Sequence, residues 1–155
     1  MTICNPTELP KMLGQDQRLL GIDLGEKTLG LALSDPGLTI ASPLETIKRT
    51  RFSKDVETLL SIMEKHGIGA IVIGLPVNMD GSEGPRCQST RQFADNLLEK
   101  IETTIVFWDE RLSTIAVTCA LLEANMSRKR RAQVVDKMAA AYILQGALDR
   151  MKEGP

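Results

Sequence analysis

The sequence has few aromatic side chains and few residues that bind metals through sulfur or nitrogen. Only 3% of its 155 residues are aromatic, so the core has to be built from aliphatic side chains. The scarcity of rings also argues against a binding platform that stacks single-stranded bases. Three scattered cysteines without a CxxC pair and one histidine, His66, argue against a structural zinc site. This cysteine usage is typical of a reduced, cytoplasmic protein.

Long apolar runs and a strong net charge are also lacking. No apolar run approaches the roughly 20 residues that cross a membrane. Glu8, Pro10 and Lys11 stand where a signal peptide would need an apolar segment, so we expect a cytoplasmic protein without a membrane partner. The net charge is −1, which means that any contact with nucleic acid has to come from local basic patches.

The hydrophobic pattern predicts one α/β domain over residues 18–152, preceded by a flexible tail over residues 1–17. Pro43 places its strand at a sheet edge, whereas the unbroken apolar run at 70–75 predicts a buried parallel strand. Strands are expected at 18–24, 29–35, 40–47, 70–75 and 104–108, and helices at about 54–66, 90–101, 114–124 and 134–151. This order predicts a mixed central β-sheet flanked by helices.

Glycine and small polar residues predict where these elements turn or begin. Gly25 is expected to take a positive φ in a tight hairpin between the first two strands. Ser53 is expected to cap the first helix and Gly67 to end it. Ser89 or Thr90 is expected to open the second helix.

Acidic residues occur at three separate places that a sheet could bring together. Asp23 lies within the first apolar strand, Asp109 and Glu110 end the strand at 104–108, and Asp136 falls in the first turn of the last helix. A charge in a buried strand is costly unless it is paired, so Asp23 either meets a cation or faces a cleft. If strands 18–24 and 104–108 are neighbours, these acids converge. The alternatives are an ion pair or helix cap for Asp23 and a helix-dipole charge for Asp136.

Converging carboxylates predict a divalent cation. Two carboxylates about 4 Å apart repel by roughly 4 kcal/mol at an effective dielectric constant of 20. Mg²⁺ takes oxygen ligands, removes this repulsion and can activate a bound water for phosphodiester hydrolysis. The absence of an identifiable Ser-His or Cys-His arrangement is consistent with such a reaction, although acidic residues at strand ends are common.

A basic run at residues 128–131, between the last two predicted helices, has two readings. It is either a solvated loop or an arm that grips phosphates. Its members are Arg128, Lys129, Arg130 and Arg131.

Four motifs resemble, in order, those of the YqgF family of bacterial Holliday-junction-resolvase-like proteins. They are GIDLGEKTLGLALSD at 21–35, IVIGLPVNMDGSEG at 71–84, DERLST at 109–114 and VDKMAAA at 135–141. The resemblance covers about residues 18–150. It implies a ribonuclease H-like fold with catalytic, metal-binding carboxylates at Asp23 and Asp136.

The resemblance also implies a middle carboxylate at Asp109 or Glu110. A strand alternates its faces, so only one of the two should point into the site, and we favour Glu110. The implied cofactor is Mg²⁺ or Mn²⁺. Candidate substrate contacts are Lys27, Asn78, Arg86 and Arg111, together with the basic run at 128–131.

The leading hypothesis is a Mg²⁺-dependent cytoplasmic nuclease that acts on structured RNA, with the 5′ end of pre-16S ribosomal RNA as the substrate that the resemblance implies. A first alternative is a Holliday junction resolvase, whose paired cuts require a dimer. A second is a nucleic-acid-binding ribosome assembly factor without catalysis. An actin-like ATPase would need two domains, for which 155 residues leave no room. We expect a monomer or a weak homodimer.

Overall fold

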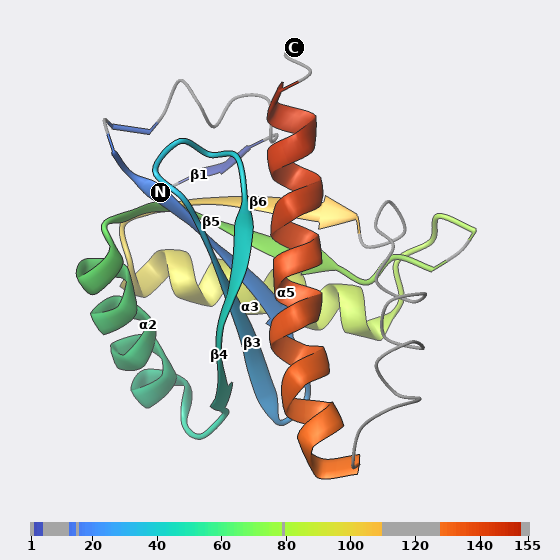
Figure 1. Ribbon diagram of the computed structural model, residues 1–155. Coiled ribbons are helices and arrows are strands. Elements are labelled where there is room, and N and C mark those ends of the chain that lie inside the picture. Colours follow the sequence, from blue (N-terminus) through green and yellow to red (C-terminus); the bar gives the residue numbers. More distant parts are fainter. Residues whose placement is uncertain (1, 5–12, 15, 79, 110–127, 153–155) are drawn as a thin grey trace.

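A six-stranded mixed sheet forms the centre of the molecule (Figure 1). The structure, a computed structural model, describes the backbone of residues 2–4, 13–14, 16–78, 80–109 and 128–152, and their side chains except those of 2–4 and 128–137. The strands are β1 (Thr2–Cys4), β2 (Arg18–Leu24), β3 (Thr28–Ser34), β4 (Ala41–Lys48), β5 (Ile68–Leu75) and β6 (Thr104–Asp109), and the helices are α2 (Phe52–His66), α3 (Pro85–Lys100) and α5 (Arg128–Lys152).

The sheet order is β1-β6-β5-β2-β3-β4. Strands β1, β6, β5 and β2 run parallel to one another, whereas β3 pairs antiparallel with β2, and β4 pairs antiparallel with β3. The predicted mixed sheet is therefore confirmed. So are the buried parallel strand β5 and the edge position of β4, the strand that contains Pro43.

Helices cover both faces of the sheet (Figure 1). Side chains of a strand alternate between faces, so Leu20 and Ile22 of β2 pack with α2 and α3, whereas Leu19 packs with α5. Burial of one such leucine or isoleucine contributes about 1.5–3 kcal/mol. None of the described helices has the length and apolarity that a membrane crossing requires.

Small side chains bring α5 close to the sheet. A Cβ placed on Gly21 of β2 would lie 2.8 Å from Leu144 Cβ and 3.0 Å from the carbonyl oxygen of Ala140. Gly146 of α5 meets the ring of Trp108 in the same way. The position of α5 over the sheet is thus fixed by close contact with β2 and β6.

The helix ends differ in part from the sequence prediction. Gly67 ends α2 in the left-handed conformation, as expected. Ser53 does not cap α2, because the helix already begins at Phe52. The buried Asp55 instead accepts hydrogen bonds from the backbone nitrogen and hydroxyl of Thr50, both at 3.1 Å.

Helix α3 begins at Pro85 after Gly84, so the prediction that Ser89 or Thr90 opens it was wrong. Pro85 suits the first helical position because its missing N–H has no partner to lose there. Gly25 takes no positive φ. Its backbone nitrogen donates to Thr28 O at 2.9 Å, and a Cβ would lie 3.0 Å from that oxygen, so close approach explains this glycine.

Two boundaries also change. Thr2–Cys4 pairs with β6 as a parallel edge strand, although the sequence predicted a loose tail there. Helix α5 begins at Arg128 rather than near Val134, so the basic run is helical and is not a loop between helices. The helix predicted at 114–124 lies outside the described residues.

Candidate metal and nucleic-acid site

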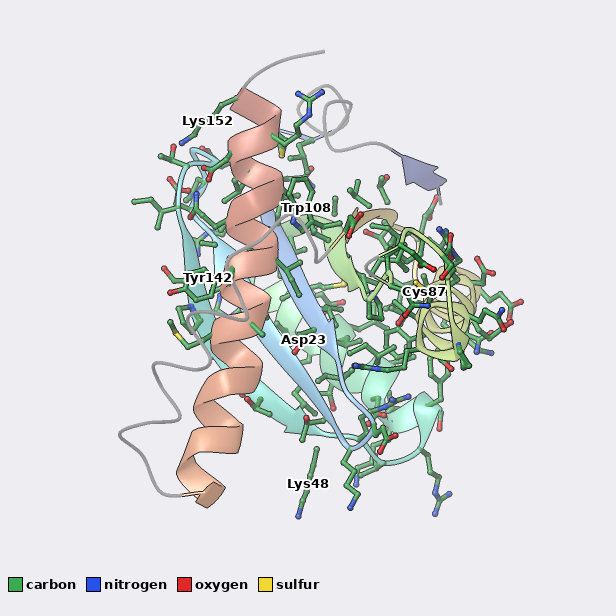
Figure 2. The ribbon with its side chains drawn as sticks, turned by 90° about the vertical axis from the view of Figure 1, so that its right-hand side faces the viewer. Asp23, Lys48, Cys87, Trp108, Tyr142 and Lys152 are labelled. Carbon is green, nitrogen blue, oxygen red and sulfur yellow. The ribbon has the colours of Figure 1, made fainter. Side chains whose placement is uncertain are left out.

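Asp23 lies near the carboxyl end of β2, a central strand of the sheet (Figure 2). It shares its face with Leu19 and Gly21, and this is the face that α5 covers. Its side chain is half-buried. A carboxylate on a rigid central strand is held in a defined direction, as a metal ligand has to be.

Helix α5 runs antiparallel to β2 across this face. Ala41 of β4 pairs with Ser34 of β3, which in turn lies opposite Leu19 of β2. The N–H of Ala41 donates to Gln145 Oε1 at 2.8 Å. Further along β2, Gly21 lies beneath Ala140 and Leu144. A step along β2 toward Asp23 is therefore a step toward the amino end of α5.

The backbone of α5 at Asp136 comes level with Asp23 by the same geometry. Asp136 stands one helical turn before Ala140, which is about 5.4 Å along the axis. Asp23 stands about 6.6 Å beyond Gly21 along the strand. Asp136 belongs to the third turn of α5, not to its first as predicted, and its side chain is outside the described set.

Asp109 does not share this face. It follows Ile105 and Phe107 in the alternation of β6, and both of these pack on the side of α2 and α3. Trp108, between them, packs with α5. The side chain of Asp109 therefore cannot lie on the same face as that of Asp23 while β6 remains a regular strand.

The condition on which these acids were expected to converge, that strands 18–24 and 104–108 are neighbours, is not met in the sheet. β5 lies between β2 and β6, which separates these two strands by roughly 9.6 Å. Glu110 and Arg111, which follow Asp109, lie outside the described residues. Among the side chains that the structure describes, no group of three acidic, histidine or cysteine residues is arranged to hold a metal ion.

Basic residues surround the end of β2 on its other side. Arg49, which follows β4, donates from Nη1 to Gly25 O at 2.6 Å, and its guanidinium lies 5.7 Å from the centre of the Phe93 ring. Arg86 lies in the first turn of α3 and is exposed. Lys27 is exposed in the loop between β2 and β3.

The sequence prediction missed Arg49. A basic cluster at residues 48–54 was visible in the sequence, but nothing in it distinguished Arg49 from its neighbours. The distinction lies in the folded chain, where Gly25 and Phe93 hold its guanidinium.

Asn78 mainly builds the loop after β5. Its backbone nitrogen donates to Ser82 O at 2.9 Å and its Nδ2 donates to Ser82 Oγ at 3.1 Å. Asp80 accepts from the Ser82 hydroxyl at 2.6 Å. These contacts keep the loop compact beside the first turn of α3. A Cβ placed on Gly84 would lie 3.4 Å from Asn78 Nδ2.

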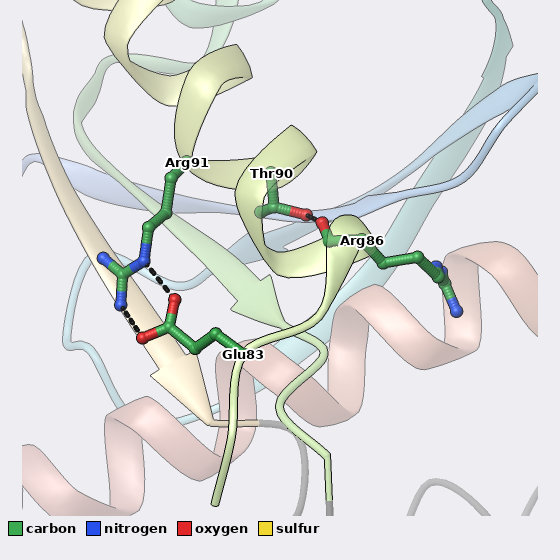
Figure 3. A network of polar contacts seen from close by, with 4 residues as sticks. All are labelled: Glu83, Arg86, Thr90 and Arg91. Atoms are coloured by element: carbon green, nitrogen blue, oxygen red, sulfur yellow. Dashed lines mark hydrogen bonds and ion pairs between the residues drawn. The ribbon is translucent and has the colours of Figure 1, made fainter.

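An ion pair neutralises one arginine of α3 (Figure 3). Arg91 donates from Nε and Nη2 to the two carboxylate oxygens of Glu83, at 2.6 and 2.9 Å. The hydrogen bond from Arg91 lowers the pKa of Glu83, and the same bond raises the pKa of Arg91. Figure 3 shows Arg86 extending away from this pair. Arg86 therefore takes no part in the ion pair with Glu83.

The solved structures that resemble the chain define its class. The RuvC protein of Thermus thermophilus, alone and in complex with a Holliday junction substrate, superposes with TM-scores of 0.53 and 0.54 at 14% sequence identity. The superposition with the complex covers 87% of this chain and 96% of that one. The fold is thus α/β and ribonuclease H-like, as predicted.

Sequence comparison gives the family. The family described as "RuvX: Holliday junction resolvase" matches residues 17–150, and the chain belongs to it. A protein of Paramagnetospirillum magneticum named "Putative pre-16S rRNA nuclease" is 64% identical over 96% of both chains. A protein of Rhodospirillum centenum with the same name is 57% identical over 99% of this chain and 85% of its own. The chain is accordingly a nuclease, and the predicted relationship to this family is confirmed.

Proposed function

We propose that the protein is a divalent-metal-dependent nuclease whose metal ligands are Asp23, Glu110 and Asp136. The observation that carries the proposal is the placement of Asp23 on a central strand, on the face where the third turn of α5 comes level with it. The family relationship supports the hydrolysis of phosphodiester bonds.

Glu110 is proposed in preference to Asp109 as the middle carboxylate. Asp109 falls on the face of α2 and α3, away from Asp23. The adjacent acidic position in the sequence is Glu110. The alternation of side chains along β6 thus supports Glu110 over Asp109, a choice that the sequence left open.

The proposed donor set consists of oxygen atoms only, which matches the preference of Mg²⁺ and Mn²⁺. A bound divalent ion would supply a water of lowered pKa and stabilise the leaving oxygen. The role of Asp23 is to hold a negatively charged oxygen at a fixed point of the sheet. The close packing of α5 on Gly21 supports the proposal that Asp136 acts at the same point.

The proposed substrate is structured RNA, with maturation of the 5′ end of pre-16S ribosomal RNA in the cytoplasm as the role. The printed names of the relatives support this choice. Exposed Lys27, in the loop after β2, and exposed Arg86, in the first turn of α3, are proposed to contact the substrate. Further proposed contacts are Asn78, Arg111, Arg128, Lys129, Arg130 and Arg131.

A second candidate substrate is a four-way DNA junction, which the family description and the RuvC complex favour. Paired cuts at a junction require two active sites, so this reading predicts a dimer. The RNA reading is compatible with a monomer. The two substrates are thus distinguished by the oligomeric state at working concentration as well as by cleavage.

The test compares both substrates under the same conditions. Purified protein is incubated with a pre-16S 5′ leader RNA or a four-way DNA junction, with Mg²⁺, with Mn²⁺ and with a chelator. We expect metal-dependent cleavage of the RNA to 5′-phosphate and 3′-hydroxyl ends, and its loss in Asp23→Asn. Cleavage that persists in the chelator, or in Asp23→Asn, would exclude the proposed mechanism.

A further inference from the structure

A pocket of about 390 Å³ opens where the loop after β2, the segment after β4 and the start of α3 meet. Its polar side chains are those of Glu26, Arg49, Arg86, Ser89 and Thr90. Leu24 also lines it and directly follows Asp23 in the chain. Because Leu24 packs on the face of α2 and α3, the pocket lies at the same end of β2 as Asp23 but on the opposite face of the strand.

Arg49 is held in this pocket as a fixed cation. Its Nη1 donates to Gly25 O at 2.6 Å, its guanidinium lies over the Phe93 ring, and its backbone nitrogen donates to Lys27 O at 2.8 Å. No carboxylate among the described residues forms an ion pair with it. A guanidinium has five N–H donors, so most of them are left for a ligand. Because the side chain is already ordered, little rotamer entropy is lost on binding.

The charges around the pocket favour an anion. Arg86 projects from the first turn of α3, which contains no acidic residue and follows the N-cap residue Gly84 without a side-chain cap hydrogen bond. The positive end of the α3 dipole adds to the two guanidinium charges. Among the described residues that line the pocket, Glu26 is the only one with a carboxylate, and it is exposed. The neighbouring Arg91, by contrast, is neutralised by Glu83.

We propose that this pocket binds a backbone phosphate that flanks the cleaved bond, with Arg49 as its fixed anchor and Arg86 as a second contact. This inference rests on the proposed nuclease function. Asp23 and Gly25 are separated by about 6.6 Å of extended chain. Two nucleotides of a strand rise through about the same distance, at 3.4 Å each. One strand can therefore present a phosphate to the pocket while a nearby bond lies at the carboxylates.

The geometry of the ligand also favours a phosphate over a nucleobase. The planar guanidinium fork matches two oxygens of a phosphate. The Phe93 ring is occupied by Arg49 and is not offered for stacking. The pocket is therefore a device for gripping the backbone, which positions a strand without reading its sequence.

Binding is measured by fluorescence anisotropy without divalent metal, so that no cleavage occurs. The probes are the labelled pre-16S leader RNA and the four-way DNA junction, each titrated over a range of salt concentrations. Arg49→Gln and Arg86→Gln are expected to weaken binding of the favoured substrate roughly tenfold, as for the loss of one charge-assisted hydrogen bond. The slope of log K against log salt should fall by about 0.7–0.9 for each variant.

Lys54→Gln is the matched control, because it removes one charge from an exposed residue of α2 that does not line the pocket. It should leave affinity and salt slope nearly unchanged. Arg86→Gln keeps the test decisive if Arg49→Gln unfolds, since Arg86 is exposed and makes no side-chain hydrogen bond to the described residues comparable to that between Arg49 and Gly25 O.

Single neutral methylphosphonates, placed in turn at each phosphate near the cut, identify the bound group. A methylphosphonate at one flanking position should weaken binding to the wild type. The same substitution should not change the affinity of Arg49→Gln. Inorganic phosphate should weakly displace the nucleic acid from the wild type. If it displaces the nucleic acid equally from the wild type and from both arginine variants, the proposed site is contradicted.

The outcomes separate this inference from the proposed function. Wild-type cleavage combined with unchanged affinity and salt slope in both arginine variants overturns the pocket and leaves the nuclease intact. Binding that depends on Arg49 and Arg86 without metal-dependent cleavage supports the pocket and overturns the nuclease proposal. If the wild type binds neither nucleic acid, both are overturned.

Discussion

Replacing Gly21 by alanine should separate α5 from the sheet and weaken both stability and catalysis. The new Cβ would lie 2.8 Å from Leu144 Cβ and 3.0 Å from Ala140 O, whereas carbon atoms in good contact are about 3.5–4.0 Å apart. The Ala140 oxygen belongs to the backbone of α5. It can retreat only if the helix moves, so the strain cannot be relieved by a side-chain rotation alone.

The magnitude follows from two opposing terms. Overpacking of this kind costs about 1–3 kcal/mol, and the backbone contact places Gly21→Ala toward the upper part of that range. Removing a glycine from a strand returns about 0.5–1 kcal/mol. The free energy of unfolding should therefore fall by about 1–2 kcal/mol. For a domain of this size, that lowers the melting temperature by roughly 2–8 °C.

The cleavage rate should fall by more than the loss of folded protein accounts for, because α5 carries Asp136. A displacement of about 1 Å in a catalytic geometry can cost roughly a hundredfold in rate. Metal-dependent cleavage by Gly21→Ala is expected to drop between about ten- and a hundredfold at temperatures where the variant is folded. The loss should therefore exceed what the unfolded fraction explains.

The assay combines thermal unfolding followed by circular dichroism with the RNA cleavage rate. Gly84→Ala is the control for stability, since its Cβ would lie 3.4 Å from Asn78 Nδ2, an ordinary contact. That variant should melt close to the wild type. A Gly21→Ala protein that melts at or above the wild-type temperature and cleaves at the full rate would refute the reasoning.

Two further predictions concern single contacts. Gly146→Ala should shift the emission of Trp108, the only tryptophan, because its Cβ would lie 2.8 Å from the indole; an unchanged spectrum would contradict this contact. The N–H groups of Ile40 and Thr39 lower the pKa of Asp35 from its ordinary value of 3.8. Its contribution to stability is present above pH 3.8 and is lost as pH falls through the lower folded value, so the melting difference between wild type and Asp35→Asn should shrink in acid. A difference independent of pH would refute that role.

The strands could be predicted from the sequence because each is a short apolar segment bounded by turn residues. The sheet order could not, since pairing depends on contacts between distant segments. The sequence left open whether the strand of Asp23 pairs with the strand of Asp109, and the structure shows that β5 lies between them. The motifs predict Asp23 and Asp136 as metal ligands, and the alternation of β6 puts Asp109 on the face opposite to that of Asp23.

Helix starts were predicted less well than helix ends. Gly67 could be predicted to end α2 because glycine readily adopts the left-handed conformation that follows a helix. The amino ends of α2 and α3 follow Arg51 and Gly84, which have no side-chain cap hydrogen bond, so the usual signal is missing. Arg49 escaped prediction for a related reason: its place beside Gly25 exists only after β4 has paired with β3.

The most direct test of the account is the metal-dependent cleavage rate of matched carboxamide variants at neighbouring positions. Glu110→Gln should lose at least about a hundredfold in rate, as expected when several kcal/mol of transition-state stabilisation are removed. Asp109→Asn, on the opposite face of β6, should stay within a few-fold of the wild type once its melting temperature confirms folding. A large loss in Asp109→Asn with normal cleavage by Glu110→Gln would contradict the placement of the metal on the face of α5.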